Sequence, residues 1–410
     1  MRVKEVQEIV AVAVSFFTIP ILSKKKVPIG IAICICSMVM ALIGGLDLLS
    51  IKDILKETFL NFNKVRQYIV IAEVGILGVL LRDYRIIDNV IKYLYRTISN
   101  KRVILMSIPA IIGLLSVPGG AIISAPFIDR LGEEANLPKT QRAIINLVYR
   151  HVPMHVMPYS SGFLIVASLA PRISLYKLAG VNLIFVMLYV VIGYFLYILP
   201  IKDIAPTSGR ISLSNLFNLL KYTSPVYSAV LLNIFFGLPF YLGLLANLLI
   251  VYLLSPKNTF LIDITRAFNF KILSALVGVY LIQGVIGEME LLSTYLTAIF
   301  ADPKAIVFGI VLISFFFGMT TGYQPTALGM IMPILAALPL SDMQLLFYCH
   351  FTFEWSFIGY FFSPLHLCQL FTCEHLGVST LELYKEYWKL FLSLVAVLII
   401  NYFLLGIWMS

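Results

Sequence analysis

The five histidines of the sequence fall in two short regions. His151 and His155 lie in the first region, and His350, His366 and His375 lie in the second. An imidazole titrates near neutral pH, so a histidine in an apolar chain is a natural proton carrier. We expect His366, which lies within an interruption of an apolar stretch, to act directly, with His155 and His350 as further proton-coupling candidates. Structural or interfacial roles are expected for His151 and His375.

Two carboxylates lie within apolar stretches, where a charged group is costly and usually functional. Glu354 follows His350 by four residues, a spacing at which two side chains on one helix share a face and can share a proton. We expect Glu354 to be a coupling residue, although His350 or Arg150 could simply neutralise it. Glu73 is the other embedded carboxylate. Arg150 could balance an anionic substrate, or its side chain could extend to the inner membrane surface.

Hydroxyl residues, glycines and prolines interrupt the apolar sequence in two pairs of places: residues 116–120 and 318–326, and residues 157–162 and 363–366. The arms around residues 116–120 are too short to span a bilayer, which favours a re-entrant hairpin over a merely kinked helix. Helix ends freed at such breaks offer amides to an anion and carbonyls to a cation, so we expect one midplane site for substrate and for any coupling sodium ion. The predicted substrate-binding residues are Ser116, Pro118, Gly119, Gly120, Ser160, Ser161, Thr320, Thr321, Gly322, Thr326, Ser363 and His366.

Zinc-ligand residue types occur in three short runs, 349–350, 366–368 and 373–375. None has the spacing of a known zinc motif, and we expect them to lie along two hydrophobic helices on both sides of the membrane. The sequence therefore favours no metal site and no cofactor other than sodium. It contains no Gly-Lys pair of a phosphate-binding loop and no His-Glu-x-x-His motif, so we expect no enzymatic activity.

The composition predicts an all-α polytopic membrane protein. Hydrophobic residues make up 60% of the 410 residues and charged residues only 12%. Apolar runs such as residues 28–46, 178–200 and 387–408 reach the roughly 20 residues that a spanning helix needs. The excess of lysine and arginine over acidic residues is a topology signal rather than a sign of nucleic-acid binding. It favours an orientation in the cell membrane with both termini outside.

An internal repeat organises the chain. Laying residues 1–200 over residues 212–410 aligns Gly78 with Gly284, Pro118 with Pro325, Pro126 with Pro333 and Pro158 with Pro364. Many transporters consist of two such halves with opposite topology. We predict inverted repeats at residues 1–200 and 225–410, joined by an inner linker at 201–224. The first comprises scaffold spans at 6–81, a hairpin at 103–130, a broken helix at 142–170 and a span at 178–200; the second comprises scaffold spans at 225–286, a hairpin at 304–340, a broken helix at 343–376 and a span at 387–409.

Two stretches carry a resemblance to known families. The sequence from Thr321 to Pro333, together with Ser363 to Cys368, resembles the integral membrane family catalogued as domain of unknown function 401. The plan of two hairpins and two broken helices resembles the ion transporter superfamily, which includes divalent anion:sodium symporters, gluconate permeases and the large membrane subunits of tripartite periplasmic transporters. The resemblance implies an elevator mechanism within a homodimer. The Ser-Asn-Thr signature of sodium-coupled dicarboxylate members is absent from the tips of both predicted hairpins. The resemblance therefore leaves sodium coupling and dicarboxylate specificity open.

These features together predict a secondary active transporter of a small anionic organic solute, driven by a sodium or proton gradient. The expected partners are this solute, the lipid bilayer and a second copy of the chain. One alternative is the membrane subunit of an uptake system that depends on a soluble binding protein. Another is a passive channel, which needs a continuous polar pore, whereas the polar residues here gather only around the midplane breaks. The third alternative is an enzyme that acts within the membrane.

Overall fold

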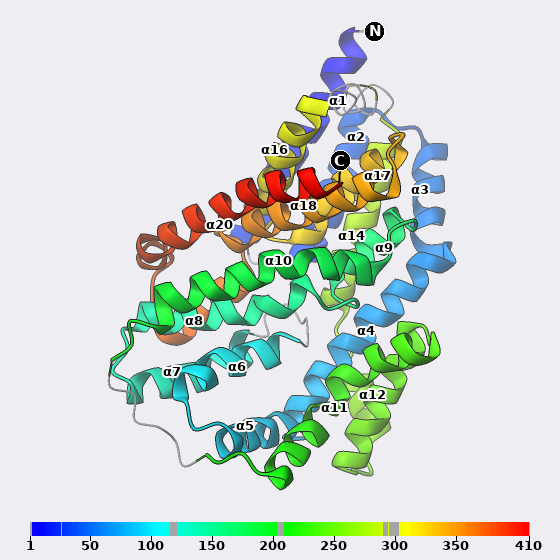
Figure 1. Cartoon of the computed structure of the whole chain (residues 1–410). Coiled ribbons are helices and arrows are strands. Elements are labelled where there is room, and N and C mark those ends of the chain that lie inside the picture. The colour runs from blue at the N-terminus through cyan, green and yellow to red at the C-terminus, as the bar shows by residue number, and fades with distance from the viewer. Residues whose placement is uncertain are drawn as a thin grey trace.

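The computed structural model describes residues 2–25, 27–114, 121–202, 209–289, 294 and 303–409. All regular elements within these residues are helical, as the sequence predicts (Figure 1). The helices of the first half are α1 (Arg2–Lys24), α2 (Ile29–Gly44), α3 (Leu48–Leu60), α4 (Phe62–Asp83), α5 (Ile86–Thr97), α6 (Lys101–Gly113), α7 (Ala121–Glu134), α8 (Lys139–His151), a 3-10 turn η1 (Val152–His155), α9 (Ser161–Leu169), α10 (Leu175–Gly193) and a π turn η2 (Tyr194–Ile198). Those of the second half are α11 (Leu213–Phe236), α12 (Phe240–Leu254), α13 (Phe260–Ala267), α14 (Phe270–Gly287), α16 (Pro303–Thr321), α17 (Gln324–Ala337), α18 (Asp342–Phe361), α19 (Leu367–Leu376) and α20 (Thr380–Met409).

Within the described residues, three helical segments are long and apolar enough to cross a membrane: Leu175–Ile198, Leu213–Phe236 and Thr380–Leu404. Shorter apolar helices accompany them, among them Gly30–Gly44 and Phe240–Leu254. Many large apolar side chains on the helices are exposed, such as Leu42 and Phe235, with 72% and 73% of their surface accessible. Exposed apolar side chains in such number are consistent with a protein embedded in lipid.

Helix α11 begins inside the segment predicted as a linker. The Ser212 hydroxyl accepts a hydrogen bond from the Asn215 amide and thereby caps the helix at Leu213. The helix then continues through Pro225 to Phe236. The predicted linker at residues 201–224 is therefore helical in its second half, and residues 203–208 lie outside the described part of the chain.

Helices from the two halves interlock in matching pairs. Within each half, α6 and α7 pack against α8, and α16 and α17 pack against α18. Between the halves, α7 packs against α19 while α17 packs against α9, and α2 packs against α14 while α12 packs against α4. In Figure 1, α1, α2 and α16 lie at the top and α5, α11 and α12 at the bottom, with α8, α10 and α18 between them. Each half therefore completes the packing of the other.

Glycines let two helices approach the interrupted helices α8 and α18 closely. A Cβ atom on Gly113 of α6 would lie 2.0 Å from the Arg150 carbonyl oxygen of α8. A Cβ atom on Gly359 of α18 would lie 2.4 Å from the Phe315 carbonyl oxygen of α16. Small residues at helix crossings are typical of membrane proteins, where close van der Waals packing holds helices together. These contacts position the chain segments that carry the buried polar residues.

Candidate functional site

Two helices stop in the interior of the protein. Helix α8 ends at His151 and is followed by η1 with Pro153, and α9 begins only at Ser161. Helix α18 ends at Phe361, and α19 begins at Leu367. Proline disfavours a helical conformation at the residue before it, so Pro158 and Pro364 help to keep both segments non-helical. These interruptions lie where the sequence places the two helix breaks, at residues 157–162 and 363–366.

The turn between α16 and α17 lies against both interruptions. Gly322 has a φ of +62°, and a Cβ atom there would lie 2.7 Å from the Leu365 carbonyl carbon and oxygen. A Cβ atom on Gly162, in the first turn of α9, would lie 3.2 Å from the Gln324 side-chain oxygen of α17. The Gln324 side-chain amide donates a 2.9 Å hydrogen bond to the Phe353 carbonyl oxygen. This hairpin tip therefore connects the starts of α9, α17 and α19.

Most of the predicted substrate-binding hydroxyls bond to the backbone. Ser363 donates to the Met319 carbonyl at 2.6 Å, and Ser160 donates to the Met154 carbonyl at 3.2 Å. Thr320 and Thr321 donate to carbonyls one turn back in α16. This use of Ser and Thr is common in helices, and it gives these residues a role in holding the breaks and the tip. The predicted residues Ser116, Pro118, Gly119 and Gly120 lie outside the described residues.

Thr326 differs from the other hydroxyl residues. It lies in the first turn of α17 and is 1% exposed, and its hydroxyl has no hydrogen-bond partner among the described residues. The side-chain oxygen of Gln324, also 1% exposed, likewise has no partner in this part of the chain. A buried polar group without a partner is costly, and such groups often mark a place where a ligand or water completes the bonding. Gln324 was not among the residues that the sequence singled out.

A second set of buried polar residues, here called the histidine–carboxylate cluster, comprises His155, Glu354, His350, Asn182 and Asn401. His155 Nδ1 lies 2.8 Å from Glu354 Oε2, and both side chains are fully buried. The ring N–H is not aligned on that oxygen, so the contact is close without being a good hydrogen bond. His155 Nε2 and Glu354 Oε1 have no hydrogen-bond partner among the described residues.

The predicted pairing of His350 with Glu354 does not form. The His350 ring lies between two asparagines: Nδ1 is 2.7 Å from Asn182 Oδ1, and Nε2 is 3.1 Å from Asn401 Nδ2. Because an amide oxygen only accepts and an amide nitrogen only donates, His350 is held as a neutral ring with its proton on Nδ1. Asn182 also donates to the His155 carbonyl at 2.8 Å. The partners of His350 are therefore set by the packing of other helices against α18 and not by its i, i+4 spacing to Glu354.

A third set, here called the histidine–cysteine cluster, brings together His151, His366 and Cys368. Their ligand atoms all lie within 4.8 Å of one another, and the two Nε2 atoms are 3.1 Å apart. The cluster forms because the chain changes direction between α18 and α19 and brings the run 366–368 beside His151, which belongs to none of the three runs that the sequence singled out. His151 is 4% exposed and contacts His366 directly, so it is not a surface residue.

Of the remaining predicted groups, Arg150 lies beside the histidine–cysteine cluster, whereas His375 and Glu73 lie elsewhere. Arg150 is 5% exposed, so its side chain does not reach a surface, and it lies within Coulombic range of Cys368 and Tyr360. The His375 side chain is 36% exposed, and its Nε2 lies 3.9 Å from Asp129 Oδ2. Glu73 is buried in α4, and its Oε2 has no hydrogen-bond partner in the described part of the chain.

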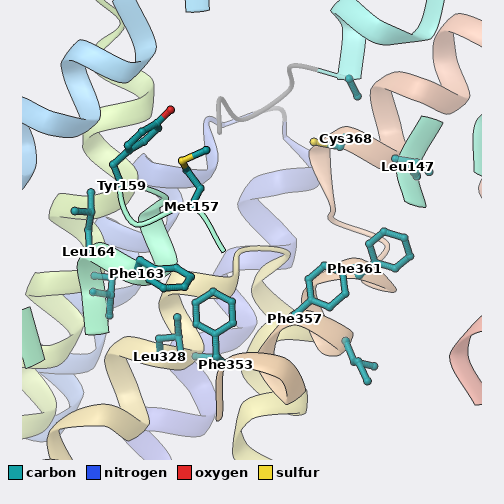
Figure 2. Packing of buried hydrophobic residues seen from close by; sticks show 14 of the residues in the cluster. Leu147, Met157, Tyr159, Phe163, Leu164, Leu328, Phe353, Phe357, Phe361 and Cys368 are labelled. Carbon is teal, nitrogen blue, oxygen red and sulfur yellow. The ribbon is translucent and has the colours of Figure 1, made fainter. Parts of the chain in front are cut away.

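Aromatic side chains separate these sets from one another. Phe353, Phe357 and Phe361 follow one another along α18 at helical spacing (Figure 2). The His155 ring contacts Phe357 at 4.2 Å between centroids, and the His151 ring contacts Phe361 at 5.2 Å. Cys368 lies at the start of α19, on the side of Leu147 (Figure 2). The polar groups therefore lie in an apolar surround that strengthens each electrostatic interaction.

Asparagines inside apolar helices were the missed signal for this site. Asn182 lies in the apolar helix α10 and is fully buried, and Asn401 lies near the end of α20 and is 1% exposed. An amide in an otherwise apolar span needs a polar partner and usually marks an internal polar contact. Both residues could have been singled out from the sequence, but their common partner, His350, could not.

Comparison with known proteins places the chain in a family without assigning it a function. A search of the curated proteins found no match. The model of the family described as "Protein of unknown function (DUF401)" matches residues 9–408, which is nearly the whole sequence. The resemblance of the segments at Thr321 and Ser363 to this family is thereby confirmed. The chain belongs to the family of proteins of unknown function DUF401.

Proposed function

We propose that this protein is a secondary active transporter that moves a small anionic solute across a membrane, coupled to the movement of a proton. The architecture that we propose is that of the ion transporter superfamily, with two inverted repeats and an elevator-type exchange of access. The observation that carries the proposal is the meeting of three helix starts at one hairpin tip, beside a buried histidine–carboxylate pair.

The packing of the helices supports the repeat. In the alignment of the halves, α2, α4, α7 and α9 correspond to α12, α14, α17 and α19. The contact of α7 with α19 therefore corresponds to that of α17 with α9, and the contact of α2 with α14 to that of α12 with α4. A pseudo-twofold arrangement of two homologous halves predicts this exchange. In transporters of this kind the substrate site lies where the halves meet, at broken helices.

The helix starts support an anionic solute. The first turns of α9, α17 and α19 have no side-chain cap at Ser160, Tyr323 or His366. Contacts of the tip with Gly162 and Leu365 bring these three starts together. Backbone amides and the positive end of the helix dipole attract anions. Thr326 adds a buried hydroxyl that lacks a partner among the described residues.

The histidine–carboxylate cluster supports proton coupling. His155 and Glu354 lie 2.8 Å apart without solvent contact, and each retains an unpartnered atom within the described residues. Adding or removing one proton changes the charge of this pair, and in an apolar surround that change strongly alters the stability of nearby conformations. His350 is less suited to this role because both of its ring nitrogens already have partners.

Ligand binding tests the anion site. The purified protein is heated with a panel of small carboxylates, amino acids and oxyanions, because a ligand that binds the folded state at 100 times its Kd stabilises it by about 2.7 kcal/mol. In Thr326→Val, loss of a hydrogen bond to a charged ligand should weaken binding by roughly 10- to 100-fold. Thr58→Val is the matched control, since Thr58 is also buried with an unpartnered hydroxyl among the described residues, but lies in α3. If no panel member stabilises the protein, it does not bind solute by itself, and the binding-protein-dependent subunit becomes the better assignment.

Transport in proteoliposomes tests the coupling. Glu354→Gln should abolish uptake driven by a pH gradient while leaving exchange of solute across the membrane largely intact. Equal loss of both activities would assign Glu354 a structural role. Uptake that a sodium gradient drives equally well in Glu354→Gln and in the unaltered protein would overturn proton coupling and favour sodium.

A further inference from the structure

We propose that His151, His366 and Cys368 form a binding site for a transition-metal ion of borderline-soft character, for which Zn²⁺ is the natural probe. The three residues come from the end of α8, the residue before α19 and the first turn of α19. Imidazole nitrogen and thiolate sulfur are the ligands that such ions prefer. The inference does not depend on the proposed transport function.

The spacing of the ligand atoms suits one ion. In tetrahedral coordination, zinc–nitrogen bonds of about 2.0 Å and zinc–sulfur bonds of about 2.3 Å place neighbouring ligand atoms roughly 3.3 to 3.8 Å apart. The two Nε2 atoms lie 3.1 Å apart, and the sulfur completes a group whose atoms are all within 4.8 Å of one another. Nitrogen and sulfur ligands of one such ion lie about 3.5 Å apart, so the widest pair would close by about 1.3 Å or less when the ion binds.

The backbone fixes the protonation of both rings. His151 Nδ1 lies 2.6 Å from the Leu147 carbonyl oxygen, and His366 Nδ1 lies 3.1 Å from the Phe361 carbonyl oxygen. A carbonyl oxygen only accepts, so each Nδ1 carries the hydrogen, and in the neutral rings both Nε2 atoms are bare. Two lone pairs that face each other at this distance suit a cation between them, which can be a metal ion or a shared proton. Metal-binding histidines characteristically donate their other ring hydrogen to a backbone carbonyl in this way.

Cys368 supplies the sulfur ligand of the proposed site. It is 3% exposed, and its sulfur lies within 4.8 Å of ring nitrogens of His151 and His366. A thiol binds metals as the thiolate, so it releases its proton when the ion binds. The Arg150 guanidinium, which lies within Coulombic range of Cys368, repels a divalent cation, so we expect weaker binding than at a structural four-ligand zinc site. The Tyr360 hydroxyl lies 3.3 Å from His151 Nε2, beside the ring nitrogen that we propose as a ligand.

Cobalt and zinc titrations test the site. The full-length protein is purified in detergent, stripped with a chelator and titrated with Co²⁺ and Zn²⁺. We expect one equivalent of Co²⁺ to bind with a thiolate-to-cobalt charge-transfer band that added Zn²⁺ abolishes. Changes next to metal ligands typically cost 10- to 100-fold in affinity, so Cys368→Ser and His366→Gln should lose at least that much. Cys373→Ser is the control, because Cys373 lies on the same helix and is 5% exposed but is not part of the cluster.

X-ray absorption of the zinc-loaded, unaltered protein gives a second readout that needs no variant to fold. We expect one sulfur at about 2.3 Å and nitrogen or oxygen ligands at about 2.0 to 2.1 Å. A zinc shell without sulfur overturns the proposal, as does Cys368→Ser binding metal as tightly as the unaltered protein. Failure of the unaltered protein to bind either ion also overturns it, and would leave a shared proton between the two imidazoles as the explanation of their approach.

Discussion

Replacing Gly322 by alanine should destabilise the protein through the contact between the hairpin tip and the second helix break. Gly322 has a φ of +62°, in the left-handed region, where a residue with a Cβ atom loses about 1–2 kcal/mol. The new methyl group would also lie 2.7 to 2.8 Å from backbone and side-chain atoms of Leu365. Relieving such an overlap in a packed interior costs typically a further 1–3 kcal/mol. We therefore expect Gly322→Ala to lower the free energy of unfolding by about 2–5 kcal/mol.

Gly237→Ala separates the two contributions to this loss. Gly237 ends α11 with a φ of +65°, and no atom lies within 4 Å of a Cβ atom placed there. Gly237→Ala should therefore lower the free energy of unfolding only by the cost of a left-handed backbone, about 1–2 kcal/mol. Unfolding of both variants in mixed micelles with increasing denaturing detergent measures the difference. If Gly322→Ala loses no more stability than Gly237→Ala, the tip does not pack on the break at Leu365, and the site proposed between them is wrong.

Three further predictions concern the polar network, a surface carboxylate and the topology. Asn182→Ala leaves His350 Nδ1 and the His155 carbonyl without their partner. The free energy of unfolding should therefore fall by about 1–3 kcal/mol for each group left unsatisfied, measured in the same unfolding assay. A loss below about 0.5 kcal/mol would contradict the network. At the surface, hydrogen bonds from Thr259 and Tyr84 hold the pKa of Asp263 below its usual range. The stability that the Asp263 carboxylate contributes is therefore present above pH about 4 and is lost as the pH falls through the lowered pKa. The stability difference between the unaltered protein and Asp263→Asn should therefore shrink on acidification, and a difference that grows would refute this. Cysteines introduced at Lys25 and Glu288 should be labelled from opposite sides of the membrane, whereas labelling from one side would exclude the predicted topology.

The positions of the helix interruptions could be predicted from the sequence because their causes are local. Proline restricts the residue before it, so Pro158 and Pro364 mark non-helical backbone wherever the chain folds. The all-helical class can be predicted for the same reason, because the long apolar runs have the length of membrane-spanning helices and are longer than buried strands. Helix α11 begins at Leu213, inside the segment that the sequence predicts as a linker, and the Ser212 side chain caps its first turn.

The partners of the buried polar residues were decided only by the tertiary structure. The sequence identifies His155, His350, His366 and Glu354 as polar groups in an apolar chain, and the spacing of His350 and Glu354 suggests a pair. Glu354 instead contacts His155, which lies 199 positions away in the sequence, and His151 contacts His366 across 215 positions. Spacing along one helix determines which side chains share a face, but the crossing of α8, α18 and α19 determines what that face meets. For this reason the sequence located the polar residues of the site, while the packing of the helices assembled them into clusters.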